Sequence, residues 1–116
     1  MSKYMEIEIK LVPAYGSGGL TGRFPNLVKL LKNHGYDRVV EKEPSLYELV
    51  DVLTRIRNDP AIDQSAKRAI LNMHDSIQKV RDEAREHLLG RRLNELDQSL
   101  YRLEDLFNDL EQEFGW

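Results

Sequence analysis

Arg81 and His87 are the two side chains of this sequence whose chemistry combines most readily in a reaction. A histidine imidazole moves protons near neutral pH, and an arginine guanidinium holds a phosphate group. The two residues lie six positions apart in a stretch rich in charged side chains. They are the catalytic candidates that the residue types alone provide.

The spacing of this pair resembles the Arg-x(4–6)-His signature of HEPN-type ribonucleases, which are small helical dimers. The resemblance covers only the segment from Arg81 to His87, and it implies a ribonuclease in which these two residues act on RNA. The other interpretation is that both are solvated polar residues near the end of a helical hairpin. We favour the second interpretation because no cleft is recognisable around them, and we assign no catalytic residue.

A glycine-rich stretch, AYGSGGLTGRFP at residues 14–25, joins a strand-like segment to a helix-like one. Backbone amides in such a loop, with a basic residue at the start of the next helix, could bind an anion. The anion-binding candidates are Gly18, Gly19, Gly22 and Arg23. The strand-helix repeats of a dinucleotide-binding fold are missing, as is a Gly-Lys-Ser/Thr motif. We therefore expect a turn whose glycines permit positive φ, with phosphate or nucleotide binding as the alternative.

His74 and Asp75 resemble the His-Asp dyad of HD-type metal phosphohydrolases, whose metal needs further His and Asp ligands. The remaining histidines are His34 and His87, and the chain has no cysteine, so a zinc site of the finger type is excluded. On the expected helix, Asp75 lies on the solvated side. We expect neither a metal nor a cofactor.

The first half of the chain predicts a small α+β unit over residues 1–58. Apolar residues alternate with charged ones in a segment that indicates a strand: Met5, Ile7, Ile9 and Leu11. An apolar stripe between Pro25 and Gly35 indicates a short helix. Residues 36–43, with two adjacent valines, indicate a second strand. Ser45 and Glu48 form a capping box that starts another helix, which completes a β-α-β-α unit.

The second half, residues 59–116, predicts two long helices. Large apolar residues follow one another at intervals of three and four, which is a heptad seam: Leu93, Leu96, Leu100, Leu103, Phe107, Leu110 and Phe114. An earlier stripe, starting after Asp59-Pro60, is out of phase with it, so one straight helix would carry seams on opposite sides. We predict a coiled-coil-like antiparallel hairpin with a left-handed turn near Gly90. A single long helix in a swapped dimer is the alternative.

The predicted fold class is therefore α+β, with the β-α-β-α unit and the hairpin in one cooperative domain. Two strands alone are marginal, so we expect covering helices or strands from a second copy in a homodimer. No stretch reaches the roughly 18 apolar residues of a membrane span, and the start lacks the apolar run of a signal peptide. These features predict a cytoplasmic protein that does not contact a membrane.

Charge is distributed unevenly along the chain. Residues 1–58 contain nine Lys or Arg against seven Asp or Glu, whereas residues 59–116 contain eight against thirteen. An acidic segment is repelled by nucleic-acid phosphates and attracts basic protein surfaces. The candidate partner-binding residues are Glu104, Asp105, Asp109, Glu111 and Trp116. We expect a non-enzymatic interaction protein, such as an adaptor, assembly factor or inhibitor, that presents an acidic hairpin and does not bind nucleic acid directly.

Overall fold

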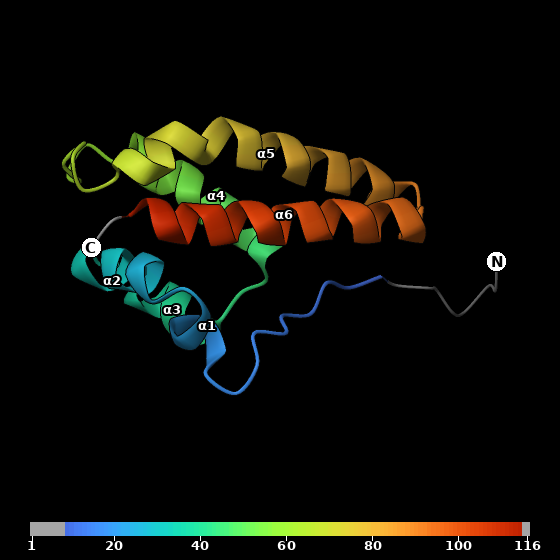
Figure 1. Ribbon diagram of the computed structural model, residues 1–116, viewed down its shortest axis with the longest axis horizontal. Helices are drawn as coiled ribbons and strands as arrows, with labels where there is room; N and C mark the ends of the chain where they lie inside the picture. The colour runs from blue at the N-terminus through green and yellow to red at the C-terminus, as the bar shows by residue number, and fades with distance from the viewer. Residues whose placement is uncertain (1–8, 115–116) are drawn as a thin grey trace.

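The computed structural model describes residues 9–114, and within them the chain forms six α-helices and no β-strand (Figure 1). The helices are α1 Gly19–Arg23, α2 Pro25–Asn33, α3 Asp37–Lys42, α4 Leu46–Asn58, α5 Arg68–Leu89 and α6 Leu93–Glu113. The predicted α+β class is therefore wrong, and the described chain is a helical bundle. Trp116 and most of the first predicted strand, including Met5 and Ile7, lie outside the described residues.

The two longest helices, α5 and α6, lie antiparallel along each other and form one side of the bundle (Figure 1). The helix α4 packs against both of them, and α2 packs against α6. The short helices α1 and α3 pack against α2. All the helices after residue 44 thus meet along the hairpin, and the small N-terminal helices are added to the bundle through α2.

The second predicted strand, residues 36–43, is the helix α3. Asp37 lies in its first turn and Lys42 in its last turn, so each charge has the sign that the nearby helix end favours. Val40 is buried and Val39 is half-buried, which gives the two valines core contacts from one helix face. Packing has overridden the strand preference of the valines, as is common for short β-branched segments. Residues 9–11 form no strand either, so the reason for expecting a second copy to complete a sheet is lost.

Two predicted helix boundaries are confirmed. The helix α2 starts at Pro25 and ends at Asn33, and Gly35 beyond it has the left-handed φ of 83°. At the start of α4, the Oγ of Ser45 accepts a hydrogen bond from the backbone N–H of Glu48 at 3.3 Å. These signals are local in the sequence, which is why they could be recognised there.

The start predicted for the next helix, at Asp59-Pro60, is wrong by about two turns. Residues 60–67 form turns instead, and α5 begins at Arg68. Asp59 does act as a local cap, because its Oδ1 accepts from the N–H of Ala61 at 2.9 Å. The hydroxyl of Tyr36 donates to the other carboxylate oxygen of Asp59 at 3.2 Å. The Asp59 side chain therefore stabilises a loop that is tied to the N-terminal helices.

The chain reverses between Leu89 and Leu93. Gly90 keeps a right-handed φ of −83°, and the left-handed residue of the turn is Arg91, with a φ of 55°. The prediction that Gly90 supplies the left-handed conformation is therefore wrong. The backbone N–H of Arg92 donates to the carbonyl of His87 at 2.9 Å, which closes the turn.

A single core lies between the hairpin and the other helices. Phe107 is fully buried at its centre, and its ring centroid lies 6.0 Å from that of Phe24. The other fully buried large side chains are Leu20, Leu27, Leu30, Leu31, Leu49, Leu53, Ile56, Ile70, Ile77, Leu103 and Leu110. Leu93 of the predicted seam is 58% exposed, because it lies at the tip of the hairpin. Over residues 9–114, every helix is too short or too polar to cross a lipid bilayer.

Candidate functional site

The glycine-rich loop presents backbone amides to a carboxylate of the same chain. Gly16 and Gly19 have positive φ values of 90° and 63°, which lead the chain into α1. The N–H of Leu20 then donates to the Oε1 of Glu43 at 3.1 Å. A Cβ atom added at Gly19 would lie 2.1 Å from the same oxygen, so glycine leaves room for this close approach. Glu43 therefore occupies the position where an anion would meet the loop.

Arg23, the fourth anion-binding candidate, lies at the end of α1 and faces a groove of about 210 Å³. The groove is formed by the extended residues 11–15, by the start of α4 and by α6, and Glu104 also lines it. The hydroxyl of Tyr15 donates to the carbonyl of Pro44 and fastens the extended segment. Burial raises the pKa of Tyr15, and the charge of Glu43 raises it further, so this hydroxyl stays protonated as a donor. The structure thus brings Arg23 and Glu104 to one groove.

Glu111 also binds within the chain. Its carboxylate accepts hydrogen bonds from the backbone N–H groups of Asn26 and Leu27, the second at 3.1 Å. These amides lie in the first turn of α2, where backbone donors lack helical partners. Burial raises the pKa of Glu111, although the two backbone hydrogen bonds act in the opposite direction. This predicted partner-binding residue fastens the end of α6 to α2.

Arg81 joins α5 to α4. Its Nη1 lies 2.8 Å from the Oδ1 of Asp51, and its Nε lies 3.2 Å from the Oδ1 of Asp82. The guanidinium carbon lies 5.4 Å from the centroid of the Tyr47 ring, which is cation–π geometry. The side chain of Arg81 is only 11% exposed. Arg81 is therefore an inter-helix contact.

His87 has different neighbours from Arg81. Its Nδ1 accepts a hydrogen bond from the Nε of Arg92 at 3.1 Å, at the hairpin turn. Six residues of α-helix separate two side chains by about 240° around the axis. The structure therefore does not bring Arg81 and His87 together at a common site.

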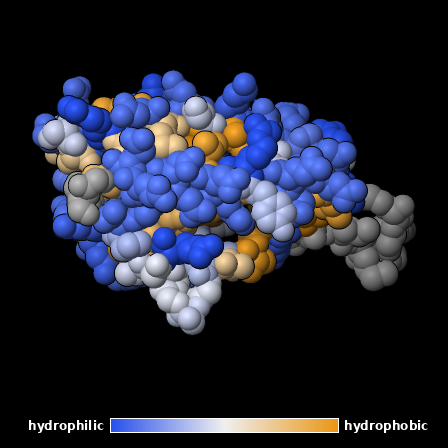
Figure 2. Space-filling view, viewed as in Figure 1, coloured by the Kyte–Doolittle hydropathy of each residue, from blue (hydrophilic) through white to orange (hydrophobic). Residues whose placement is uncertain are grey.

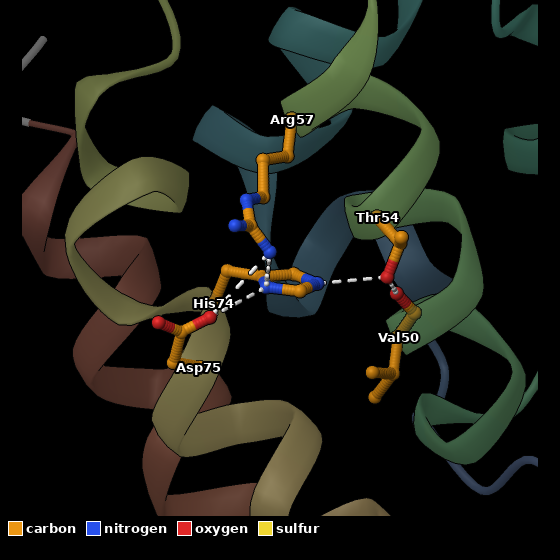
Figure 3. Close-up of polar contacts among 5 residues, drawn as sticks. All are labelled: Val50, Thr54, Arg57, His74 and Asp75. Carbon is orange, nitrogen blue, oxygen red and sulfur yellow. Dashed lines mark hydrogen bonds and ion pairs between the residues drawn. The ribbon is translucent and has the colours of Figure 1, made fainter.

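His74 is buried between α5 and α4, with an exposed fraction of 1% (Figure 3). Its Nε2 lies 2.7 Å from the Oγ1 of Thr54, which donates its own proton to the carbonyl of Val50. The hydroxyl must therefore accept from Nε2–H, and Nδ1 carries the lone pair. The Nη1 of Arg57 lies 3.0 Å from Nδ1 and donates to it.

Asp75 lies on the solvent side of this cluster. Its side chain is 88% exposed and its Oδ1 lies 3.5 Å from the Nη1 of Arg57 (Figure 3). The same oxygen lies 3.3 Å from the Nδ1 of His74, but with the proton on Nε2 this nitrogen has none to donate, so Asp75 accepts from Arg57. Both ring nitrogens are thus used in structural hydrogen bonds. Among the described residues, no three His, Cys, Asp or Glu side chains come together as metal ligands.

Lys67 is buried and holds the end of α4, a role that the sequence analysis did not predict. Its Nζ donates to the carbonyls of Ile56, Arg57 and Asp59, at 3.1, 2.9 and 2.8 Å. These carbonyls belong to the C-terminal end of α4, where backbone acceptors lack helical partners and a positive charge is favoured. One signal was available in the sequence: Lys67, the residue before α5, lies at helical spacing from Ile70 and His74, so two polar residues interrupt an apolar face.

The outward face of α6, by which we mean Asp97, Tyr101, Glu104, Asp105 and Asp109, faces solvent. Tyr101 is 61% exposed. Arg102, the one basic residue of α6, pairs with Glu83 of α5 at 2.9 Å. The side of the molecule along which α6 runs is predominantly hydrophilic (Figure 2). Three of the five predicted partner-binding residues, Glu104, Asp105 and Asp109, share this face.

The charged side chains of this protein thus fall into two groups: those that hold helices together and those that face solvent.

Comparison of the chain with protein-family models, with curated proteins and with solved structures found no match.

Proposed function

We propose that this protein is a non-enzymatic interaction module that docks the outward face of α6 against a basic surface of another protein. The observation that carries this proposal is the concentration of four exposed carboxylates on one helix face. Within residues 9–114 these carboxylates form no ion pair, whereas Arg81 and Arg102 of the same hairpin do. An adaptor, an assembly factor and an inhibitor all fit this description.

The position of the acids in the helix supports a role outside the fold. A carboxylate near a helix C-terminus costs about 0.3–1 kcal/mol, because the helix dipole is negative there. Asp109 and Glu113 lie in or near the last turn of α6. Glu111 offsets this cost by binding the amides of α2, whereas Asp109 and Glu113 bind no backbone amide or cation within residues 9–114. Their unfavourable position for the helix fits a role in binding.

The sign of the charge indicates the class of partner. A row of carboxylates repels phosphate groups, so direct nucleic-acid binding is unfavourable. Basic protein surfaces are attracted, and the attraction raises the association rate at low ionic strength. The proposal also includes a cytoplasmic location, which is supported by the sequence patterns described above and not by the fold.

The proposal is tested by capture with the immobilised full chain in an extract of the native host. Proteins retained by the wild type are identified, and the capture is repeated with Glu104→Lys/Asp105→Lys. We expect the double variant to bind its basic partner at least about ten-fold more weakly, because two attractions become repulsions.

The matched control reverses two exposed carboxylates elsewhere, with Glu41→Lys/Glu86→Lys on α3 and α5. This control changes the net charge equally and should retain the partner. Equal capture by wild type and Glu104→Lys/Asp105→Lys would refute the proposal.

A further inference from the structure

The contact between α4 and α5 contains a small arginine-binding arrangement. Tyr47 and Asp51 lie one turn apart on α4, and both face Arg81 of α5. The tyrosine ring lies beneath the guanidinium at 5.4 Å, and the aspartate binds Nη1 at 2.8 Å. A tyrosine followed four residues later by an aspartate on a helix therefore binds an arginine in this molecule, through a ring face and an ion pair.

The same pair of residue types recurs on the outward face of α6. Tyr101 and Asp105 are four residues apart, as are Tyr47 and Asp51, in the segments YRLED and YELVD. Here both side chains are exposed. Asp97 lies one turn before Tyr101 on the same side of the helix, so the ring has a carboxylate on each side.

In the part of the chain that the structure describes, the second pair, Tyr101 and Asp105, holds no arginine. Arg102, next to Tyr101, is directed to Glu83 of α5. Asp105 lines a shallow depression together with Arg102 and Lys79, yet it forms an ion pair with neither of them within the described residues. Tyr101 and Asp105 thus have the sequence spacing of Tyr47 and Asp51, but they bind no cation within residues 9–114.

We propose that Tyr101, with Asp105 and Asp97, binds an arginine side chain presented by a protein partner. This inference rests on the proposed function and names the contact at its centre. Arginine fits better than lysine, because a planar guanidinium stacks on the ring and donates to a carboxylate at the same time. Tyrosine and arginine are also the residue types that most often dominate binding energy at interfaces.

The test is a titration of the isotope-labelled full chain with acetyl-tetra-arginine amide, followed by NMR, with acetyl-tetra-lysine amide as the matched peptide. We expect the arginine peptide to shift the amide signals of residues 97–105 and to bind several-fold more tightly than the lysine peptide. Tyr101→Leu should lower the affinity for the arginine peptide about five-fold, whereas Tyr101→Phe should retain the affinity, because the ring face is kept.

Asp105→Asn and Asp63→Asn remove the same charge, the first at the site and the second from the exposed loop before α5. Only Asp105→Asn should clearly weaken binding of the arginine peptide. Equal binding of both peptides, or equal losses in the two Asn variants, would overturn the inference, since either result indicates unspecific attraction.

The outcome is distinguishable from that of the proposed function. If Tyr101→Leu leaves peptide binding unchanged while Glu104→Lys/Asp105→Lys still abolishes capture of the native partner, the arginine site is wrong and the interaction module stands. If both variants behave as wild type, both proposals fail. All the substituted side chains are exposed, so the fold is expected to be retained in each variant.

Discussion

The charged residues at the contacts between helices differ from those on the outward face of α6 in what they bind. Glu43 binds an amide of α1, Glu111 binds two amides of α2, and Lys67 binds three carbonyls at the end of α4. Arg81 binds a carboxylate and a ring of α4. The carboxylates of the outward face bind no other helix within the described residues. The difference separates charges that stabilise the fold from charges that are available for a partner.

Replacing Lys67 should have the largest effect on stability. Lys67→Met keeps the apolar stem but removes three hydrogen bonds from a charged donor, which leaves the end of α4 without its partner. We expect the free energy of unfolding to fall by about 3 kcal/mol. Urea unfolding followed by circular dichroism measures the loss. Arg68→Met at the exposed neighbouring position should change it by less than about 0.5 kcal/mol, and similar losses at both positions would show that the buried cation has no special role.

Replacing Arg81 should have a smaller effect. Arg81→Met removes the ion pair with Asp51 and the contact with the Tyr47 ring, and we expect a loss of about 1.5 kcal/mol. Asp51 is 66% exposed, so the ion pair contributes only part of this value. A double-mutant cycle with Tyr47→Leu separates the two contributions. A coupling of zero would contradict the cation–π contact and weaken the parallel with Tyr101.

Glu111→Gln should cost about 1 kcal/mol at pH 3, where the wild-type side chain is a neutral carboxyl group, because the –NH2 of the amide would face one of the two backbone N–H groups of α2. Its pH dependence has a definite sign. The pKa of Glu111 is raised in the folded chain, so its proton is held more tightly there than in the unfolded chain. The stabilisation from Glu111 is therefore fully present at pH values below its pKa in the unfolded chain. It is lost as the pH rises through the pKa of Glu111 in the folded chain.

The stability advantage of wild type over Glu111→Gln should therefore shrink between pH 3 and pH 7. Urea unfolding of both proteins across this range gives the difference. An advantage that grows with pH would mean that the hydrogen bonds from α2 outweigh the burial of the carboxylate.

The parts of the fold that could be predicted are those set by neighbours in the sequence. Ser45 caps α4 and Gly35 follows α2 because turn and cap preferences act over three or four residues. The helix α3 could not be predicted, because two valines favour a strand until the packing of Val40 is known. The start of α5 could not be predicted either. The loop before it is organised by hydrogen bonds from Lys67 to carbonyls that lie eight to eleven residues earlier in the chain, at the end of α4.

The candidate sites follow the same division. The sequence predicted a turn near Gly19, with anion binding by its amides as the alternative, and the carboxylate found there is Glu43, 23 residues beyond its donor Leu20. Nothing local in the sequence indicates that contact. In the same way, Glu111 could be recognised as acidic, but not as the partner of α2, which lies 84 residues away at Leu27. The exposure of Asp105 and Asp109 follows more directly, because they lie opposite the apolar stripe of their own helix.

The most direct test of the account measures stability and binding together in Glu104→Lys/Asp105→Lys. We predict that the free energy of unfolding stays within about 0.5 kcal/mol of wild type, as for exposed residues without fold contacts, while affinity for the captured partner falls at least about ten-fold. A loss of 2 kcal/mol or more in stability, or unchanged affinity for the partner, would contradict the claim that the outward face of α6 is a docking surface.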